Sequence, residues 1–392
     1  MGNCKCEIHY YKETENEPKP QTLFDSNEIK SNTIKNIPTQ KNNYSEELED
    51  ITELDLNPTI QNKILKLGAF IPFRDYHKLI KPKILEYIKS HKLNYQEYCP
   101  SKSTKYKSNP LEFENGNIYY GEWNNEGEME GYGIYILRDK NIISEGIWIK
   151  GNIIYGRIFF PNEDIYEGKM NDSLPHGFGI IYFLNGEIYK GDFVNGEMTG
   201  NGTFIYADKS YYTGELKNGV FHGLGTLKWN NGTEYHGYFD RATLSGEGKI
   251  YNDLLKEKYI GNFDKNDFNF YGVYTYKNGD VYKGNFEKGI RQGKGKYIRN
   301  DGVEFDIQWN NDLPNGSGVV IYNGNQIKGN WREGNMIGKK ELIKGNLEVF
   351  NEIDLNLEAS KRNIFPASMP YIDLNDNEES EYALGTDMTP NL

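Results

Sequence analysis

Two kinds of hydrophobic pattern divide the chain. From about residue 117 to 340, apolar and polar residues alternate in short runs, such as Phe204 with Tyr206 or Leu227 with Trp229. Alternation of this kind predicts β-strands, because successive side chains of a strand point to opposite faces. Before residue 108 the recognisable spacing is helical. We therefore expect a mainly β protein, an elongated single-layer antiparallel meander of hairpins preceded by a short helical segment.

The helical patterns lie between residues 45 and 107. We expect one helix with Ser45 as its N-cap and a second helix that begins at Pro58, because proline fits well at the first position of a helix. A third pattern runs from Tyr76 to Leu93. Pro82 lies inside it and is expected to kink this helix or to split it in two.

A unit of the form aromatic-x-Gly-x-aromatic recurs every 22 to 25 residues, ten times in all. In most copies a Gly-x-Gly follows the last aromatic position by seven residues. The clearest units are Tyr119 to Trp123, Tyr189 to Phe193, Tyr235 to Phe239, Tyr259 to Phe263 and Tyr282 to Phe286. The glycines that we expect to be structural are Gly121, Gly168, Gly191, Gly214, Gly237, Gly261, Gly284 and Gly329.

Asn-Gly pairs such as Asn195-Gly196 and Asn218-Gly219 separate the runs, and these residues adopt positive φ easily in hairpin turns. Each unit is therefore predicted to be strand, turn, strand. Neighbouring hairpins are expected to pair into a quasi-one-dimensional sheet. The glycines have a packing reason, because a residue without Cβ allows an aromatic ring from the adjacent hairpin to lie flat over the backbone.

These residues carry a resemblance to a known family. The pattern Tyr-x-Gly-x-aromatic, six further residues and Gly-x-Gly resembles the membrane occupation and recognition nexus, or MORN, repeat over residues 117–340. Four copies depart from it: the second has Tyr155 and Arg157 where glycines are expected, the seventh has Phe270, the ninth Ile307, and the tenth ends with Lys340. The resemblance implies a twisted single-layer sheet. It also implies a scaffold between membranes and cytoskeletal or signalling proteins, with phosphoinositide binding and homodimers among the family's properties.

The charge is unevenly distributed. The whole chain has a net charge of −12, which disfavours a nucleic-acid binder because phosphate binding needs a positive surface. Residues 59–107 carry ten Lys and one Arg against three acids, whereas residues 345–392 carry ten acids against two bases. Residues 108–344 have a net charge of −6. We interpret residues 345–392 as an acidic disordered tail and residues 1–44 as a disordered N-terminal segment.

The first six residues suggest acylation. Gly2 suits N-myristoylation, although Cys6 stands where the motif has Ser or Thr, and Cys4 and Cys6 suit S-palmitoylation. The alternative is an accidental glycine and two idle thiols. Two acyl groups would hold the chain on a membrane, which one myristoyl chain does only weakly.

The basic block at residues 59–107, within the helical segment 45–107, would add attraction to anionic lipids of the cytosolic leaflet. The side chains expected to contact the membrane are Lys63, Lys66, Arg74, Lys78, Lys81, Lys83, Lys89 and Lys92. An equally good interpretation makes this block a helical cap that covers the open edge of the first strand.

Nothing in the sequence indicates catalysis. The Gly-x-Gly strings precede no helix and no phosphate-loop Lys, so they are not nucleotide sites. His176 and His222 occupy one repeat position that varies between copies, and Cys99 has no partner cysteine. We therefore predict no catalytic, cofactor or metal site, and no enzyme. Neither flank of the array is long enough for a catalytic domain of the kind that some MORN relatives carry.

The function that follows is a non-catalytic, membrane-associated scaffold. No apolar run approaches the ~18 residues of a spanning helix, so we expect a cytoplasmic, peripheral protein held by a lipid anchor, in contact with cytoskeletal or signalling partners. The membrane contact would come from the N-terminus, and the repeats would serve as a protein-binding arm. The alternative is a targeting subunit of a signalling enzyme such as a phosphoinositide kinase, or a ligand of a calmodulin-like protein.

Overall fold

The computed structural model describes residues 68–70, 80–91, 93, 106–107 and 110–358. The predicted helices at Ser45 and Pro58 lie outside these residues. The elements are β1 (Gly68–Phe70), α3 (Pro82–Ser90), β2 (Tyr106–Lys107), β3 (Leu111–Phe113), β4 (Ile118–Trp123), β5 (Met129–Leu137), β6 (Ile142–Ile149), β7 (Asn152–Phe159), β8 (Ile165–Asn171), β9 (Leu174–Tyr182), β10 (Ile188–Val194), β11 (Glu197–Ile205), β12 (Tyr211–Lys217), β13 (Val220–Lys228), β14 (Thr233–Asp240), β15 (Thr243–Asn252), β16 (Glu257–Asp264), β17 (Asp267–Thr275), β18 (Val281–Glu287), β19 (Ile290–Ile298), β20 (Glu304–Asn310), β21 (Leu313–Tyr322), β22 (Asn325–Arg332), β23 (Asn335–Lys344) and η3 (Leu347–Phe350).

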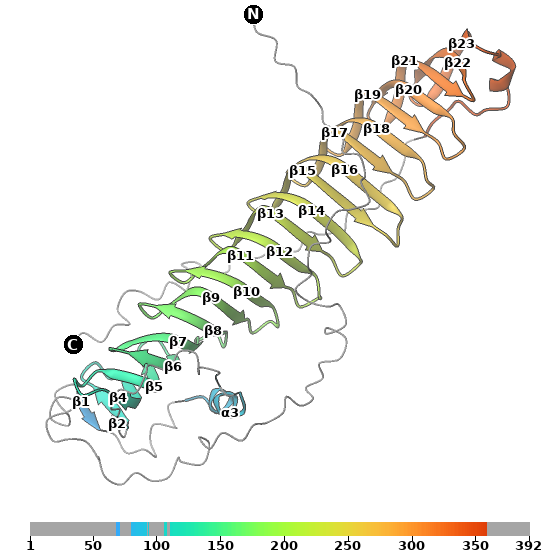
Figure 1. Cartoon of the computed structure of the whole chain (residues 1–392). Coiled ribbons are helices and arrows are strands. Elements are labelled where there is room, and N and C mark those ends of the chain that lie inside the picture. Colours follow the sequence, from blue (N-terminus) through green and yellow to red (C-terminus); the bar gives the residue numbers. More distant parts are fainter. Residues whose placement is uncertain (1–67, 71–79, 92, 94–105, 108–109, 359–392) are drawn as a thin grey trace, which may run out of the picture. The chain divides into compact units, whose positions relative to one another are not determined.

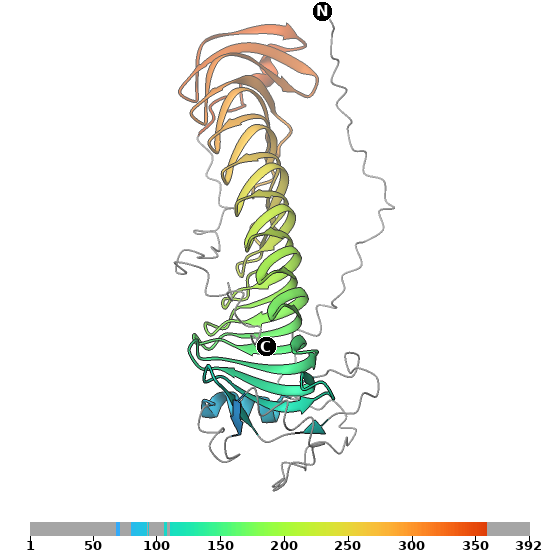
Figure 2. The same cartoon turned by 90° about the vertical axis from the view of Figure 1, so that its left-hand side faces the viewer.

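The strands form one open antiparallel meander. From β3 to β23 each strand pairs with the next along the chain, and β4 to β23 make the ten hairpins that the period predicts. Figures 1 and 2 show these hairpins stacked along a twisted axis, with their strands curved into arcs. The predicted fold class is therefore confirmed.

Two kinds of turn join the strands. Longer turns join most hairpins to the next hairpin. In nine of the ten hairpins the turn inside the hairpin has two residues, as at Asn195 and Gly196, which both have positive φ and join Val194 to Glu197. Such turns match the twist of the flanking strands. Their amides also bond to the preceding hairpin: the Gly196 amide donates to the Pro175 carbonyl at 2.8 Å. The turns therefore couple neighbouring hairpins as well as closing their own.

A pair of facing glycines lies in the middle of most hairpins. Gly191 of β10 pairs with Gly202 of β11, and a Cβ on either one would lie within 2.5 Å of the Tyr189 side chain. The ring therefore comes from the tyrosine two residues earlier on the same strand. The prediction that it comes from the adjacent hairpin is wrong. Because the side chains of residues two apart share a face of a strand, the ring needs only to fold along its own strand.

The same tyrosine repairs an irregularity in the ladder. Register shifts follow the first glycine of the pair, for example between Gly191 and Phe193, as in a β-bulge. The Tyr189 hydroxyl donates to the Asp192 carbonyl in this region at 3.0 Å, and Tyr235 does the same for Tyr238 at 2.9 Å. Burial of a carbonyl without a partner would cost about 1–3 kcal/mol. This explains why a tyrosine suits the position.

Two departures from the pattern are accommodated locally. In the second hairpin Gly146 pairs with Gly156, which lies between the two places where we expected glycines, so this hairpin is one residue shorter. In the ninth, Ile307 pairs with both Gly295 and Gly318. Its side chain lies where a Cβ on Gly318 would be, so it takes space that a tyrosine ring fills elsewhere. The sheet continues through both hairpins.

The N-terminal side differs from the prediction. The helix α3 begins at Pro82 and is neither kinked nor split by it, because proline at the first helical position loses no hydrogen bond. The edge of the first hairpin is not covered by this helix. Strand β2 pairs with β4, and β1 pairs with β3, so short strands extend this edge.

The C-terminal side also contains a correction. Residues 345–358, which we assigned to a disordered tail, pack against the last hairpin. Phe350 of η3 and Leu355 are buried, and the Trp331 indole donates to the Leu355 carbonyl at 2.8 Å. The Leu357 amide donates to the Gly334 carbonyl. The apolar residues that lie among the acids of this segment form the cap. A net charge counted over residues 345–392 does not reveal them. Residues 359–392 lie outside the described part of the chain.

Candidate functional site

The sheet has one buried face and one open face. The repeat tyrosines, among them Tyr189, Tyr235 and Tyr282, are fully buried with their neighbouring Phe and Trp side chains in one continuous core. The face that bears these tyrosines is therefore occupied by this packing. The opposite face, on which Lys190 pairs with Thr203, is the surface available to partners.

At its N-terminal end the open face is covered by α3. Ile80 and the helix residues Ile84, Tyr87 and Ile88 pack on apolar side chains of β4 to β8, and the Tyr87 ring meets Phe159 edge-on at 6.0 Å. Figure 1 shows the helix against these first hairpins. The apolar face of α3 is thus used within the molecule.

A buried arginine fastens the helix to the sheet. Arg157, whose side chain is 3% exposed, forms ion pairs with Glu167 at 2.8 Å and with Glu145 at 3.6 Å. It donates to the carbonyl of His91, the C-cap of α3, and its guanidinium lies 5.4 Å from the centre of the Tyr87 ring. Burial raises the pKa of Glu145, which also accepts a hydrogen bond from the Tyr132 hydroxyl at 2.6 Å. The cluster serves to dock the helix.

Beyond α3 the open face carries apolar and basic side chains on both sides of the glycine pairs; Lys249 and Lys258 are half-buried and the others are exposed. Cross-strand register places them on one face, since Leu224 pairs with Tyr238 and Lys249 with Ile260. We call this surface the open-face patch. Its residues, from β13 to β19, are Leu224, Tyr238, Lys249, Lys258, Ile260, Phe270, Tyr271, Lys283 and Lys294.

The patch is more basic than the array as a whole. Lys283 lies directly opposite another lysine, Lys296, which is bonded to Glu304 at 2.9 Å. The Lys249 ammonium lies 4.4 Å from the centre of the Tyr251 ring, and desolvation together with Lys258 lowers its pKa. The array's net charge of −6 therefore conceals a local excess of positive charge.

Phe270 is an outlier within the patch. It has φ +54°, whereas the corresponding residues of other hairpins are glycines, such as Gly246 at φ +61°. A Cβ on Gly246 would lie 3.7 Å from Tyr238, so this position points to the open face, and Phe270 is 66% exposed. A bulky residue in left-handed conformation is strained. Backbone outliers of this kind cluster at functional sites. The strain therefore indicates that Phe270 is kept for a function and not for folding.

Replacement of Phe270 with glycine is expected to stabilise the array by roughly 1 kcal/mol, because the left-handed penalty of about 1–2 kcal/mol exceeds the entropy that glycine adds. The exposed ring contributes little packing that would be lost. Thermal unfolding would measure the change, with Tyr271→Gly, an ordinary strand position, as the destabilising control. A lower melting temperature for Phe270→Gly would contradict this account of strain.

The predicted membrane-contact residues are only partly described. Lys81 and Lys83 lie 3.5 and 3.9 Å from Glu163, and Lys89 is exposed. The others, Lys63, Lys66, Arg74, Lys78 and Lys92, lie outside the described residues, as do the lipidation candidates Gly2, Cys4 and Cys6. Of the eight structural glycines, seven lie against the tyrosine two residues earlier, whereas Gly329 lies against Met336 and Trp331.

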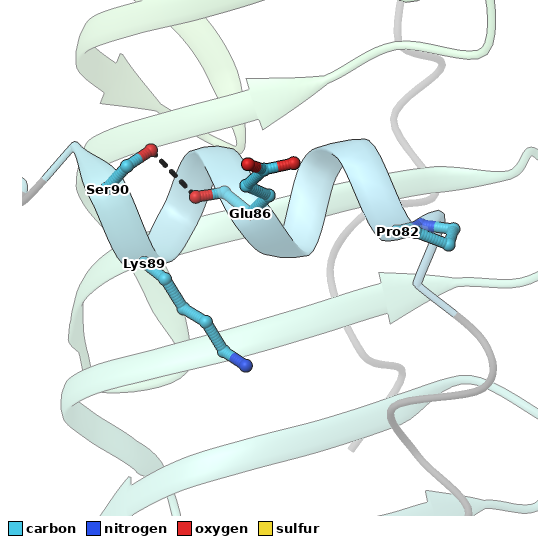
Figure 3. Close-up of a pocket in the computed structure, with 4 residues that line it drawn as sticks. All are labelled: Pro82, Glu86, Lys89 and Ser90. Atoms are coloured by element: carbon cyan, nitrogen blue, oxygen red, sulfur yellow. Dashed lines mark hydrogen bonds between the residues drawn. The ribbon is translucent and has the colours of Figure 1, made fainter.

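A hollow on the outer side of α3 offers no chemistry. It is lined by Pro82, Glu86, Lys89 and Ser90, all from one helix, and Figure 3 shows the strands running behind it. The Ser90 hydroxyl already donates to the Glu86 carbonyl at 2.7 Å. Within the described ranges there is no group of three potential metal ligands. Nor does that part of the chain contain a helix long and apolar enough to cross a bilayer.

Sequence reasoning missed the open-face patch and the arginine cluster. Phe270 was a visible signal, since it interrupts a glycine position, but we interpreted it only as local irregularity. Arg157 also stood at an expected glycine place. Departures within an otherwise regular repeat were therefore the available signal for both features.

Comparison with known proteins gives a family match and weak structural likenesses. A family model described as MORN repeat matches seven segments within the array. The comparison with curated proteins found no match. The matched segments are residues 119–142, 166–188, 189–211, 212–234, 259–281, 282–304 and 308–326.

Among solved structures, the TCP10 domain of Danio rerio CPAP in complex with a STIL peptide is similar at 10% identity and a TM-score of 0.34, covering 61% of this chain and 99% of that one. The TCP10c domain of Drosophila melanogaster Sas-4 is similar at 14% identity and a TM-score of 0.22, covering 43% and 93%. These TM-scores are too low to carry an argument about function.

Proposed function

Because the chain belongs to the MORN-repeat family, we propose that it is a non-catalytic scaffold, anchored to a membrane at its N-terminus, whose repeat array presents the open-face patch to a protein partner. The observation that carries the proposal is the set of exposed aromatic and basic side chains on a sheet whose other face is a packed core. Aromatic residues are enriched at the centres of protein interfaces. A sheet of coupled hairpins holds such residues in fixed positions.

The separation of the two roles is supported by the charge distribution. The basic block is at residues 59–107, where three described lysines lie on or beside α3, and Gly2, Cys4 and Cys6 precede it. Anionic lipid attracts this block and an acyl group adds affinity. The alternative, α3 as a ligand for a calmodulin-like protein, is disfavoured because Ile84, Tyr87 and Ile88 already pack on the sheet.

The Gly2→Ala variant is expected to shift most of the protein from membranes to the soluble fraction, because neither acylation nor the second anchor that depends on it would remain. Fractionation of cells that express the full chain would measure this. Tyr238→Ala with Tyr271→Ala is the matched control and should leave the membrane fraction unchanged. Undiminished membrane binding of Gly2→Ala would count against the anchor.

The protein-binding role is tested by a photoreactive amino acid placed at Tyr271 of the full chain, with the same group at Tyr211 as a control on the same face outside the patch. We expect a defined polypeptide to crosslink at Tyr271, and Tyr238→Ala to weaken that product. Equal crosslinking at both positions would argue against a specific surface. The membrane and protein contacts are thus measured independently.

A further inference from the structure

The open-face patch is a surface without a described occupant inside the molecule. On β4 to β8 the same face is covered by α3, whereas on β17 Phe270 and Tyr271 are 66% and 58% exposed. The surface is therefore continuous with an intramolecular interface. Its chemistry, large apolar side chains among lysines, fits an acidic segment that also carries apolar residues.

A segment with this chemistry follows the described chain at the end of the array nearer the patch. Residues 359–392 carry six acids against Lys361 and Arg362, and they include Ile364, Phe365, Tyr371 and Ile372 shortly before the acidic run. We infer that this C-terminal segment docks on the open-face patch, with acids on Lys249, Lys258, Lys283 and Lys294 and apolar side chains beside Phe270 and Tyr271. The inference rests on the proposed function, because it makes the segment a competitor for the partner surface.

The geometry permits this docking. The described chain ends at residue 358, just after Leu357 bonds to Gly334 in the turn between β22 and β23, at the rim of the sheet. Five strand spacings separate β22 from β17, roughly 24 Å at ~4.8 Å each. An unstructured chain as long as the remaining 34 residues has a root-mean-square span of about 30 Å. Effective concentration is highest when the span of the tether matches the separation.

Charge placement favours docking of acids on the half of the patch that bears most of its lysines. Between the glycine pairs and the longer turns, the only acid of β14 and β15 is Glu234, which is bonded to Lys228. The acids Asp264, Asp267 and Glu287 lie instead beside the two-residue turns. Phe270 and Tyr271 lie on that same side of the glycine pairs. An acidic segment is therefore attracted to the neighbouring half of the open face, which bears Lys249, Lys258 and Lys283, next to the exposed aromatic residues.

The strained Phe270 gains a purpose in this arrangement. A glycine would be the more stable choice at its position, yet the ring stands on the open face beside Tyr271. A rigid exposed aromatic pair gives an incoming apolar side chain a surface to bury against. Docking would place the ring in an environment that offsets its strain.

Zero-length carbodiimide crosslinking of the dilute, purified full chain tests the inference, because the reagent joins only carboxylates and amines in contact. We expect the acids of residues 359–392 to form amides with the patch lysines roughly tenfold more often than with the turn lysines Lys209 and Lys277. A tenfold ratio corresponds to about 1.4 kcal/mol of association free energy. High salt should reduce the difference. Equal crosslinking of patch and turn lysines would overturn the inference.

Two variants separate docking from folding. Lys258→Glu with Lys283→Glu should reduce crosslinks several-fold at the remaining Lys249 and Lys294, whereas Lys209→Glu with Lys277→Glu should not. Phe270→Gly should also reduce them several-fold while it raises the melting temperature, so unfolding cannot explain the loss. Unchanged crosslinks in both patch variants would overturn the inference.

The origin of the crosslinks identifies the occupant. Products between two chains that increase with protein concentration would assign the patch to a second copy, and products with the acids of residues 1–67 would assign it to the N-terminal segment. Either result overturns docking by residues 359–392. The measurement involves no membrane and no partner, so its failure leaves the photocrosslinking and fractionation tests of the proposed function untouched.

Discussion

The Gly237→Val variant is expected to lose roughly 3–5 kcal/mol of stability, from overpacking and from the loss of a buried hydrogen bond. A Cβ on Gly237 would lie 2.3 Å from the Tyr235 hydroxyl and 2.8 Å from the Gly248 backbone. The ring cannot retreat without losing its bond to the Tyr238 carbonyl, and the backbone cannot retreat without parting β14 from β15. The disturbance affects hairpins on both sides, because the sheet is stabilised by neighbouring contacts.

The matched control is Gly329→Val near the end of the array. Its Cβ would meet mainly the terminal methyl of Met336, at 2.4 Å, and the Trp331 ring, at 3.0 Å. A flexible methionine can move aside, and only one strand of the sheet, β23, lies beyond this position. Thermal unfolding should therefore show a clearly smaller loss for Gly329→Val. Equal losses would contradict the one-dimensional picture of stability.

Replacement of Arg157 with methionine is expected to release α3 and to cost about 3–5 kcal/mol, the usual result of removing one partner from a buried ion cluster. The carboxylates of Glu145 and Glu167 would remain together, with Glu145 almost fully buried. The His91 carbonyl would lose its guanidinium donor. Hydrogen exchange should show lost protection in α3 while the central hairpins stay protected.

The arginine effect should depend on pH. Burial raises the pKa of Glu145, and Arg157 opposes that rise, so the variant's Glu145 takes up a proton at still higher pH. A carboxyl with a raised pKa in the folded state makes folding less favourable as pH rises through that pKa. The loss caused by Arg157→Met should therefore be smaller at about pH 5 than at about pH 8.

A triple variant provides the control for both results. Arg157→Met combined with Glu145→Gln and Glu167→Gln leaves no uncompensated charge, and neutral replacement of a buried ion cluster is often tolerated. It should recover much of the lost stability and most of the pH dependence should disappear. If the triple variant is as unstable as Arg157→Met alone, packing by the arginine stem matters more than its charge.

The sequence by itself determined the repeat architecture. The spacing of the glycines, the alternation of apolar residues and the Asn-Gly pairs act within a hairpin or between neighbours, so a period read along the chain contains them. For that reason the meander and turns such as Asn195-Gly196 were predictable, and the family resemblance followed from the same residues.

Only the tertiary structure decided which face of the sheet is available. Glycines and tyrosines alone do not show that each ring folds over its own strand and fills the core, which leaves the opposite face open. The bond from Arg157 to His91 joins residues 66 positions apart, and no periodicity records such a contact. The direction of Phe270 likewise depends on a positive φ imposed by the hairpin around it. Long-range packing and backbone conformation, not local pattern, therefore set the surface on which the function is proposed.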